Sequence, residues 1–201
     1  MTSTAKATGS QRHRRLAVIL TETSSPAVCV VIGLVVVAWH SANGTGAAWA
    51  AVAILLCAGV PMGYIAKGVK AGKWSDHHVG RREQRTVPLL VGLGSVAVAS
   101  GLLILVGAPR PLIALVLSQL AGLFAVLVIT RFWKISIHCA TAGGLLGVLV
   151  AMFGPWALLG VVPLAMIAWA RVVLDAHTWM QVAAGASLGF LIGSTLYPLL
   201  S

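Results

Sequence analysis

The sequence predicts an all-α protein, a polytopic transmembrane helical bundle with six or seven spans. Hydrophobic residues make up 59% of its 201 residues, charged residues make up only 9%, and the mean hydropathy is +0.96. A soluble domain carries roughly 25% charged residues, so this chain has too little polar surface to cover a water-soluble globule. We therefore expect one integral membrane domain.

The chain begins with a short basic leader. Residues 1–15 contain four Lys or Arg residues and one histidine, and we expect a cytoplasmic segment without fixed structure. The apolar stretch that follows is short and ends in a polar run, which is not the pattern of a cleaved signal peptide. The sequence therefore predicts a leader over residues 1–15 and a single transmembrane domain over residues 16–201.

Seven apolar segments are candidate membrane helices, and Pro, Gly or basic residues bound most of them. A span needs roughly 20 residues. The first segment reaches that length if it begins near Leu16, and the fifth and sixth are short, which leaves the count at six or seven. The segments are 26–39, 47–66, 87–107, 111–130, 139–153, 155–170 and 178–199.

Basic residues occupy every other connection. The leader and residues 67–85, 131–138 and 171–177 carry Lys or Arg, whereas the connections between them are neutral or carry one Arg. By the positive-inside rule these basic connections meet at the cytoplasmic face of the plasma membrane. The net charge of +10 suits anionic membrane lipids as partners, and the absence of a nucleic-acid motif argues against nucleic acid.

Small residues indicate close helix packing. Gly185, Gly189 and Gly193 recur every four residues along the last segment, and further glycines lie near the start of the fifth. Such ridges let helix backbones approach closely, so we assign them to packing and not to phosphate binding. The three cysteines form no CxxC pair and are expected to be apolar fillers without a disulfide.

The third basic connection contains an arginine and a histidine, Arg171 and His177, at the edge of the membrane. Their spacing of six does not share a helix face, so they converge only if the chain turns between them. His177 and Gln181 are four apart and share a face, so Gln181 is expected to bond one ring nitrogen and leave the other free. This arrangement suits a nucleophile for a phosphoryl group. The alternative is a snorkelling arginine beside an interfacial histidine.

The second basic connection places Ser136 and His138 at a helix start. Backbone N–H groups and the helix dipole favour an anion there, and Lys134 adds a cation. A histidine titrates near neutrality, so His138 is a candidate general acid. The alternative is a basic and aromatic belt at the membrane surface.

The first basic connection is the longest polar stretch. Its candidates for binding phosphate are Lys73, Arg82 and Arg85. Asp76, His77 and His78 would suggest a metal, but adjacent histidines are expected to point apart and no carboxylate cluster follows. We therefore predict no metal site. A basic loop that only sets the topology is the alternative.

Two further acids are site candidates. Glu22 is the only acid near the first span and is expected to pair with a residue of a basic loop. Asp175 lies two residues before His177, a spacing that argues against a shared helix face.

The pattern Ser136-x-His138 followed by Arg171-x5-His177-x3-Gln181 resembles motifs two and three of the type 2 phosphatidic acid phosphatase superfamily. Its members are membrane lipid phosphate phosphatases, and these motifs read Pro-Ser-Gly-His and Ser-Arg-x5-His-x3-Asp. The first connection stands where the family's first motif, Lys-x6-Arg-Pro, is expected. The resemblance extends from about Lys73 to the C-terminus.

The resemblance implies a phosphatase that needs no metal or cofactor. His177 matches the histidine that attacks phosphorus and forms a phosphohistidine, and His138 matches the histidine that protonates the leaving group. Arg171 and Ser136 match phosphate-binding residues, and Lys73 matches the first motif's lysine loosely. The expected substrate is a phosphomonoester or diphosphate of a lipid, of polyprenyl or phosphatidate type, with a slight preference for polyprenyl.

The sequence departs from the family pattern at several positions. Ile135 and Ile137 replace the Pro and Gly of the second motif, and Ala170 replaces the Ser of the third. Gln181 replaces the Asp that orients the nucleophile, and a neutral amide does not offset imidazolium charge, so turnover is expected to be lower. The alternative function is therefore a catalytically weakened, phosphatase-like protein that binds or transports lipid phosphates.

Overall fold

The computed structural model describes residues 2–42 and 46–201, and within these ranges every regular element is a helix. Side chains are described for 11–41 and 46–201. The predicted all-α class is thus confirmed. The helices are α1 (Thr2–Thr23), α2 (Pro26–Ala42), α3 (Gly46–Ile54), η1 (Leu55–Gly59), α4 (Val60–Lys70), η2 (Arg82–Gln84), α5 (Thr86–Leu105), α6 (Arg110–Phe132), α7 (Ile137–Phe153), η3 (Pro155–Gly160), α8 (Val161–Val173) and α9 (Trp179–Leu200).

The chain is a multi-pass helical membrane protein. Among the described residues, five continuous helical stretches are long and apolar enough to cross a membrane, and the bent pair formed by α1 and α2 brings the count to six if it is one span. The apolar helix α7 is shorter, at 17 residues. Large apolar side chains such as Leu105 and Leu159 are exposed on the outside, where lipid would cover them.

The helix that precedes Pro26 begins inside the predicted leader. Residues 11–15 are helical and continue without a break to Thr23, because no Pro or Gly interrupts this stretch. The expectation that the unstructured leader extends to residue 15 is therefore wrong for 11–15. The chain bends by 45° before Pro26, which has no N–H to continue the helix. The Thr23 hydroxyl donates to the Ile19 carbonyl at 2.8 Å and helps to satisfy this helix end.

The second span contains one turn of π-helix, η1, between α3 and α4. Pro61 follows this turn and has no N–H, so it leaves a carbonyl of the preceding turn without its helical partner. The Ser95 hydroxyl of α5 donates to the Leu56 carbonyl at 2.6 Å. The neighbouring span thus satisfies a polar group that the irregular turn exposes.

The closest helix contact joins α7 and α9 through the predicted glycine ridges. A Cβ atom placed on Gly189 would lie 1.9 Å from the Ala140 carbonyl oxygen, and one on Gly143 would lie 2.3 Å from that of Ala186. Real Cβ atoms do not approach backbone so closely, so these positions need glycine. The packing interpretation of these ridges is confirmed.

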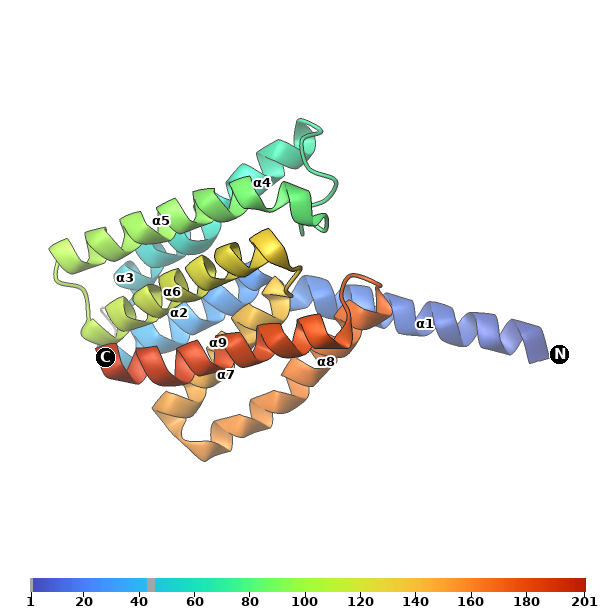
Figure 1. Ribbon diagram of the computed structural model, residues 1–201. Coiled ribbons are helices and arrows are strands. Elements are labelled where there is room, and N and C mark those ends of the chain that lie inside the picture. The colour runs from blue at the N-terminus through green and yellow to red at the C-terminus, as the bar shows by residue number, and fades with distance from the viewer. Residues whose placement is uncertain (1, 43–45) are drawn as a thin grey trace.

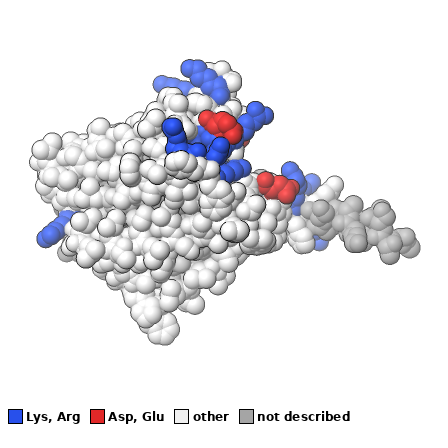
Figure 2. All heavy atoms as spheres, in the orientation of Figure 1, with Lys and Arg blue, Asp and Glu red and all other residues white. Residues whose placement is uncertain are grey.

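The basic connections meet at one end of the bundle, as the charge alternation predicted. In Figure 1 the end of α1, the loop between α4 and α5, the turn between α6 and α7 and the loop between α8 and α9 lie together. Figure 2 shows the Lys and Arg side chains of this view concentrated towards that end, with a largely uncharged body. The cytoplasmic orientation of this end stays a prediction.

Gly189→Ala is expected to lower the free energy of unfolding by about 1–3 kcal/mol, because the added methyl group forces α7 and α9 apart. Gly101 in α5 is the matched control, since a Cβ atom there meets nothing within 4 Å. Gly101→Ala should leave stability unchanged or raise it slightly. Thermal unfolding in detergent measures both, and equal melting temperatures for the two variants would contradict the packing account.

Candidate active site

The first turn of α9 fixes the imidazole of His177. Thr178 is the N-cap of this helix and forms a reciprocal capping pair with Gln181. The Gln181 Oε1 atom accepts from the Thr178 backbone N–H at 3.3 Å and lies 2.9 Å from His177 Nδ1. The Thr178 backbone N–H needs an acceptor, so it is the oxygen of the Gln181 amide that faces both Thr178 and His177. Because this oxygen can only accept, Nδ1 of His177 carries the hydrogen. The predicted His177–Gln181 bond is present and leaves the Nε2 lone pair free.

The chain reverses direction between Arg171 and His177. The backbone N–H groups of Ala176 and His177 both donate to the Arg171 carbonyl, at 3.1 and 3.2 Å, and Asp175 has a φ of 55°. The turn that the spacing requires is therefore present, and both Arg171 and His177 are buried. Asp175 is exposed at the turn, and in the described part of the chain it has no hydrogen bond to His177.

Three cations act on His177, one from each basic connection: Arg85, Lys134 and Arg171. Burial is the largest cause that lowers the pKa of His177, and the three charges lower it further, to about 3. The hydrogen bond to Gln181 opposes this shift. His177 is therefore a neutral imidazole at physiological pH.

These three cations have no carboxylate partner among the residues whose side chains are described. Arg171 is buried at the end of α8, and its Nε atom has no hydrogen-bond partner among the described residues. Lys134 is half-buried, and burial followed by the charges of Arg85 and Arg171 lowers its pKa. No salt bridge to these three residues occurs within the described ranges. Like charges held together without a counter-ion favour a bound anion.

The second connection joins the same site at the start of α7. Ser136 is fully buried, caps this helix by accepting from the Cys139 N–H at 3.4 Å, and donates its own N–H to the Gln181 carbonyl at 3.2 Å. His138 follows in the first turn and is buried. Its Nε2 atom has no hydrogen-bond partner among the described residues. The Ser136–Gln181 bond fixes the two helix starts side by side.

The arginines of the first connection bind backbone carbonyls. Arg85 is buried and donates from Nε to the Val79 carbonyl at 3.0 Å and from Nη1 to the Ile135 carbonyl at 2.9 Å. Arg82 donates to the Phe132 carbonyl at 3.0 Å. Phe132 and Ile135 lie at and beyond the end of α6, where helix geometry leaves carbonyls unpaired. Both arginines thus tie the first connection to the second.

Lys73 and Asp76 lie outside the cluster around His177. Lys73 is exposed, and its side chain has no hydrogen bond in the described part of the chain. Burial raises the pKa of Asp76, but hydrogen bonds from Ser75 and from the Gly80 and His78 N–H groups outweigh it and lower the pKa overall. Asp76 therefore shapes its own loop.

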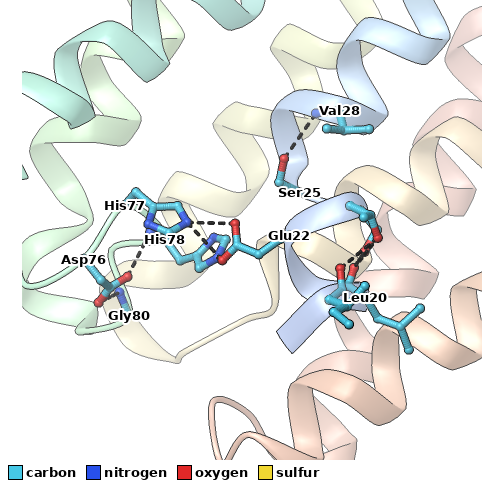
Figure 3. Close-up of polar contacts among 11 residues, drawn as sticks. Leu20, Glu22, Ser25, Val28, Asp76, His77, His78 and Gly80 are labelled. Carbon is cyan, nitrogen blue, oxygen red and sulfur yellow. Dashed lines mark hydrogen bonds and ion pairs between the residues drawn. The ribbon is translucent and has the colours of Figure 1, made fainter. Parts of the chain in front are cut away.

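Glu22 pairs with the basic loop as expected, through two adjacent histidines. The carboxylate lies 3.1 Å from His77 Nε2 and 3.0 Å from His78 Nε2. Figure 3 shows both rings turned towards Glu22. The expectation that adjacent histidines point apart is wrong, because His77 and His78 are the central residues of a tight turn that the Val79 N–H closes on the Asp76 carbonyl at 3.1 Å. One of the two reasons for predicting no metal site in this loop is thereby removed. The sequence predicts a basic-loop partner for Glu22 but does not identify it, since 55 residues separate Glu22 from His77.

A cavity of about 360 Å³ extends from this end into the bundle. Its polar end is formed by Glu22, His77, His78, Arg85 and His138. Its remaining walls, from α2, α4, α5, α6, α7 and α9, are largely apolar. Arg171 and His177 do not line it. The volume falls within the range of small-molecule sites, and the polarity suits an amphiphile.

Arg85→Met is expected to destabilise the protein by about 1–3 kcal/mol, because it removes the donors to two carbonyls and leaves them unpaired. Arg81 in the same loop is exposed and its side chain makes no hydrogen bond in the described ranges, so Arg81→Met is the matched control. Chemical or thermal unfolding in detergent compares the two variants. Equal stability would contradict the bracing role of Arg85.

The depressed pKa of His177 predicts a loss of stability in acid. Its folded pKa of about 3 lies below the ordinary value of 6.5, so the unfolded chain binds a proton that the folded chain does not. The stability that depends on a neutral His177 is fully present above pH 6.5 and is lost as the pH falls towards 3. The melting temperature of wild type should therefore fall more between pH 7.5 and 5.5 than that of His177→Asn, which is neutral throughout. Parallel pH profiles would refute the assignment.

Comparisons of the chain with protein-family models, with curated proteins and with solved structures found no match. The likeness to type 2 phosphatidic acid phosphatases therefore rests on the motifs quoted from the sequence. The geometry around His177 is the basis on which a function is proposed.

Proposed function

We propose that the protein is an integral membrane phosphatase that hydrolyses a lipid phosphate or diphosphate through a phosphohistidine. One observation carries the proposal. His177 is neutral, with its Nδ1 atom held by Gln181 and its Nε2 lone pair free. It lies among cations that form no salt bridge within the described part of the chain. A fixed, neutral imidazole beside an anion-binding cluster suits attack on phosphorus.

The cations supply the binding site for the phosphoryl group. A buried guanidinium with an unpaired Nε–H, as in Arg171, is costly, and phosphoryl oxygens would satisfy it. Arg85 and Lys134 add charge from the two other connections. Charge that develops on the phosphoryl oxygens in the transition state would be stabilised by all three. The hydroxyl of Ser136 adds a further polar group.

The proposed reaction uses two histidines. His177 Nε2 attacks phosphorus and the bond from phosphorus to the ester oxygen breaks. His138, in the imidazolium form that a bound phosphate dianion would favour, gives a proton to the departing alkoxide and becomes neutral. Water then attacks the phosphohistidine, His138 takes back a proton, and phosphate leaves as His177 is restored. The free Nε2 atom of His138 and the position of His138 at the polar end of the cavity support this role.

The substrate proposed is a phosphorylated lipid reached from the cytoplasmic face of the plasma membrane. The largely apolar cavity suits a polyprenyl or acyl chain, and the polar end suits its phosphorylated head. Of the two lipid types, the polyprenyl type is the one that we slightly prefer, as in the sequence analysis. The reaction needs no cofactor.

A second candidate is a phosphatase-like protein that binds or transports lipid phosphates without turnover. Two observations favour it. The partner of His177 is the neutral Gln181, which does not offset the positive charge of a phosphohistidine. In addition, His177 does not line the cavity, so a lipid held there would not meet the imidazole without a movement of the chain.

Phosphate release from a panel of lipid phosphates in detergent tests the proposal. His177→Ala should abolish turnover, and His138→Ala should reduce it by about 10²–10⁴-fold. Gln181→Asp should keep or raise activity, because a carboxylate accepts the same hydrogen bonds and adds a negative charge. His40→Ala is the control, since His40 packs against Phe153 at the far end of α7.

Two outcomes would overturn the proposal. If the folded wild type releases no phosphate from any lipid of the panel, the phosphatase assignment fails, and lipid retention in native mass spectrometry would then favour the binding protein. If His177→Ala and His138→Ala release phosphate as fast as wild type, the catalytic assignment fails. A large loss in Gln181→Asp would show that the amide has a specific role.

A further inference from the structure

Glu22, His77 and His78 form a cluster that the proposed phosphatase reaction does not use. Their ligand atoms all lie within 4.8 Å of one another. Both imidazoles present Nε2 to the carboxylate, at 3.0 to 3.2 Å, and the two ring centroids are 4.0 Å apart. Figure 3 shows the carboxylate facing both rings.

The loop is built so that neighbouring side chains face the same way. Adjacent residues of an extended chain point to opposite sides. Here Asp76 accepts the His78 N–H at 2.8 Å and the Gly80 N–H at 3.3 Å, and Val79 takes a left-handed φ of 47°. A β-branched residue is rarely found in that conformation. The chain thus adopts an uncommon turn at the point where it gathers two imidazoles.

The geometry fits a single bound ion. Two imidazole nitrogens and one carboxylate are the ligand set of many three-residue zinc sites, with bonds of about 2.0–2.1 Å. In a tetrahedral site such bonds place neighbouring ligand atoms about 3.3 Å apart, close to the 3.0 to 3.2 Å between Nε2 and carboxylate oxygen. Glu22 and His77 are half exposed, so an ion from solution has access.

A neighbouring histidine gives a second observation. His138 is 4% exposed, and its Nε2 atom has no hydrogen-bond partner among the described residues. It lines the same polar end of the cavity as the cluster, and its ring centroid lies 5.0 Å from that of His78. A buried ring nitrogen that has no partner among the described residues and lies beside three ligands would be satisfied by a polar group or an ion-bound water.

We propose that Glu22, His77 and His78 bind one divalent transition-metal ion of the Zn²⁺ type, with water or a ligand oxygen completing its coordination. The ion joins the end of α1 to the first basic connection at the polar end of the cavity. It adds positive charge there and holds the loop that carries Arg85. The site does not depend on chemistry at His177.

Binding of Co²⁺, a spectroscopic substitute for Zn²⁺, tests the site. The full chain in detergent, carrying His177→Ala so that turnover plays no part, is titrated with Co²⁺. We expect one equivalent to bind, with the visible absorption of low-coordinate Co²⁺, and Zn²⁺ to displace it and raise the melting temperature. Glu22→Gln and His78→Ala should each weaken binding at least about tenfold, because each removes one of three ligands.

Matched controls separate the cluster from adventitious sites. Glu83→Gln removes an exposed acid of the same loop, and His40→Ala removes a histidine near the end of α2. Both should bind Co²⁺ like the parent. Size-exclusion profiles establish that each variant is folded, and the conservative Glu22→Gln change keeps the size of the side chain.

The proposal is overturned if the folded parent binds no Co²⁺, which would leave a hydrogen-bonded cluster only. It is also overturned if Glu22→Gln and His78→Ala bind as tightly as the two controls. Phosphate release by a chelator-treated wild type is scored separately. If the protein binds Co²⁺ but releases no phosphate, the result counts against the phosphatase. If it releases phosphate but binds no Co²⁺, the result counts against the metal site.

Discussion

The close contact between α7 and α9 is the constraint on which the site depends. The Gly189 position faces the Ala140 carbonyl with no room for a Cβ atom, so the two backbones lie as near as helices can. This contact continues to the charged end, where the Ser136 N–H reaches the Gln181 carbonyl. The two helix starts that carry His138 and Gln181 are therefore fixed relative to each other by the small residues of the bundle together with this backbone hydrogen bond.

Local periodicity accounts for what the sequence predicted correctly. Three correct predictions depend on neighbouring residues only. They are the apolar runs of membrane length, the basic connections at one end of the bundle and the bond between His177 and Gln181. The sequence predicts an unstructured leader up to residue 15 because residues 11–15 are polar and charged. The stretch from Gln11 to Thr23 contains no helix breaker, however, and the helix simply continues through the charges.

Contacts between distant segments account for what the sequence could not predict. The sequence indicates a basic-loop partner for Glu22 but not the histidine pair that it meets across 55 residues. The turn from Asp76 to Val79 that gathers those rings has no sequence signature, because valine is a poor candidate for positive φ. Sequence spacing also gave no indication that Arg85, a predicted phosphate ligand, donates two bonds to the carbonyls of Val79 and Ile135. Every helix end leaves carbonyls unpaired, and tertiary packing decides which of them lie near an arginine.

Gln181 Oε1 accepts hydrogen bonds from the Thr178 backbone and from His177 at the same time. One atom thus serves both helix initiation and the alignment of an imidazole. Helix termini open more often than helix centres, since fewer bonds hold them. Each time the first turn of α9 frays, the ring loses its tether while the rest of the bundle stays intact. The fraction of molecules with an aligned His177 is therefore set by local opening at one helix end, long before global unfolding contributes.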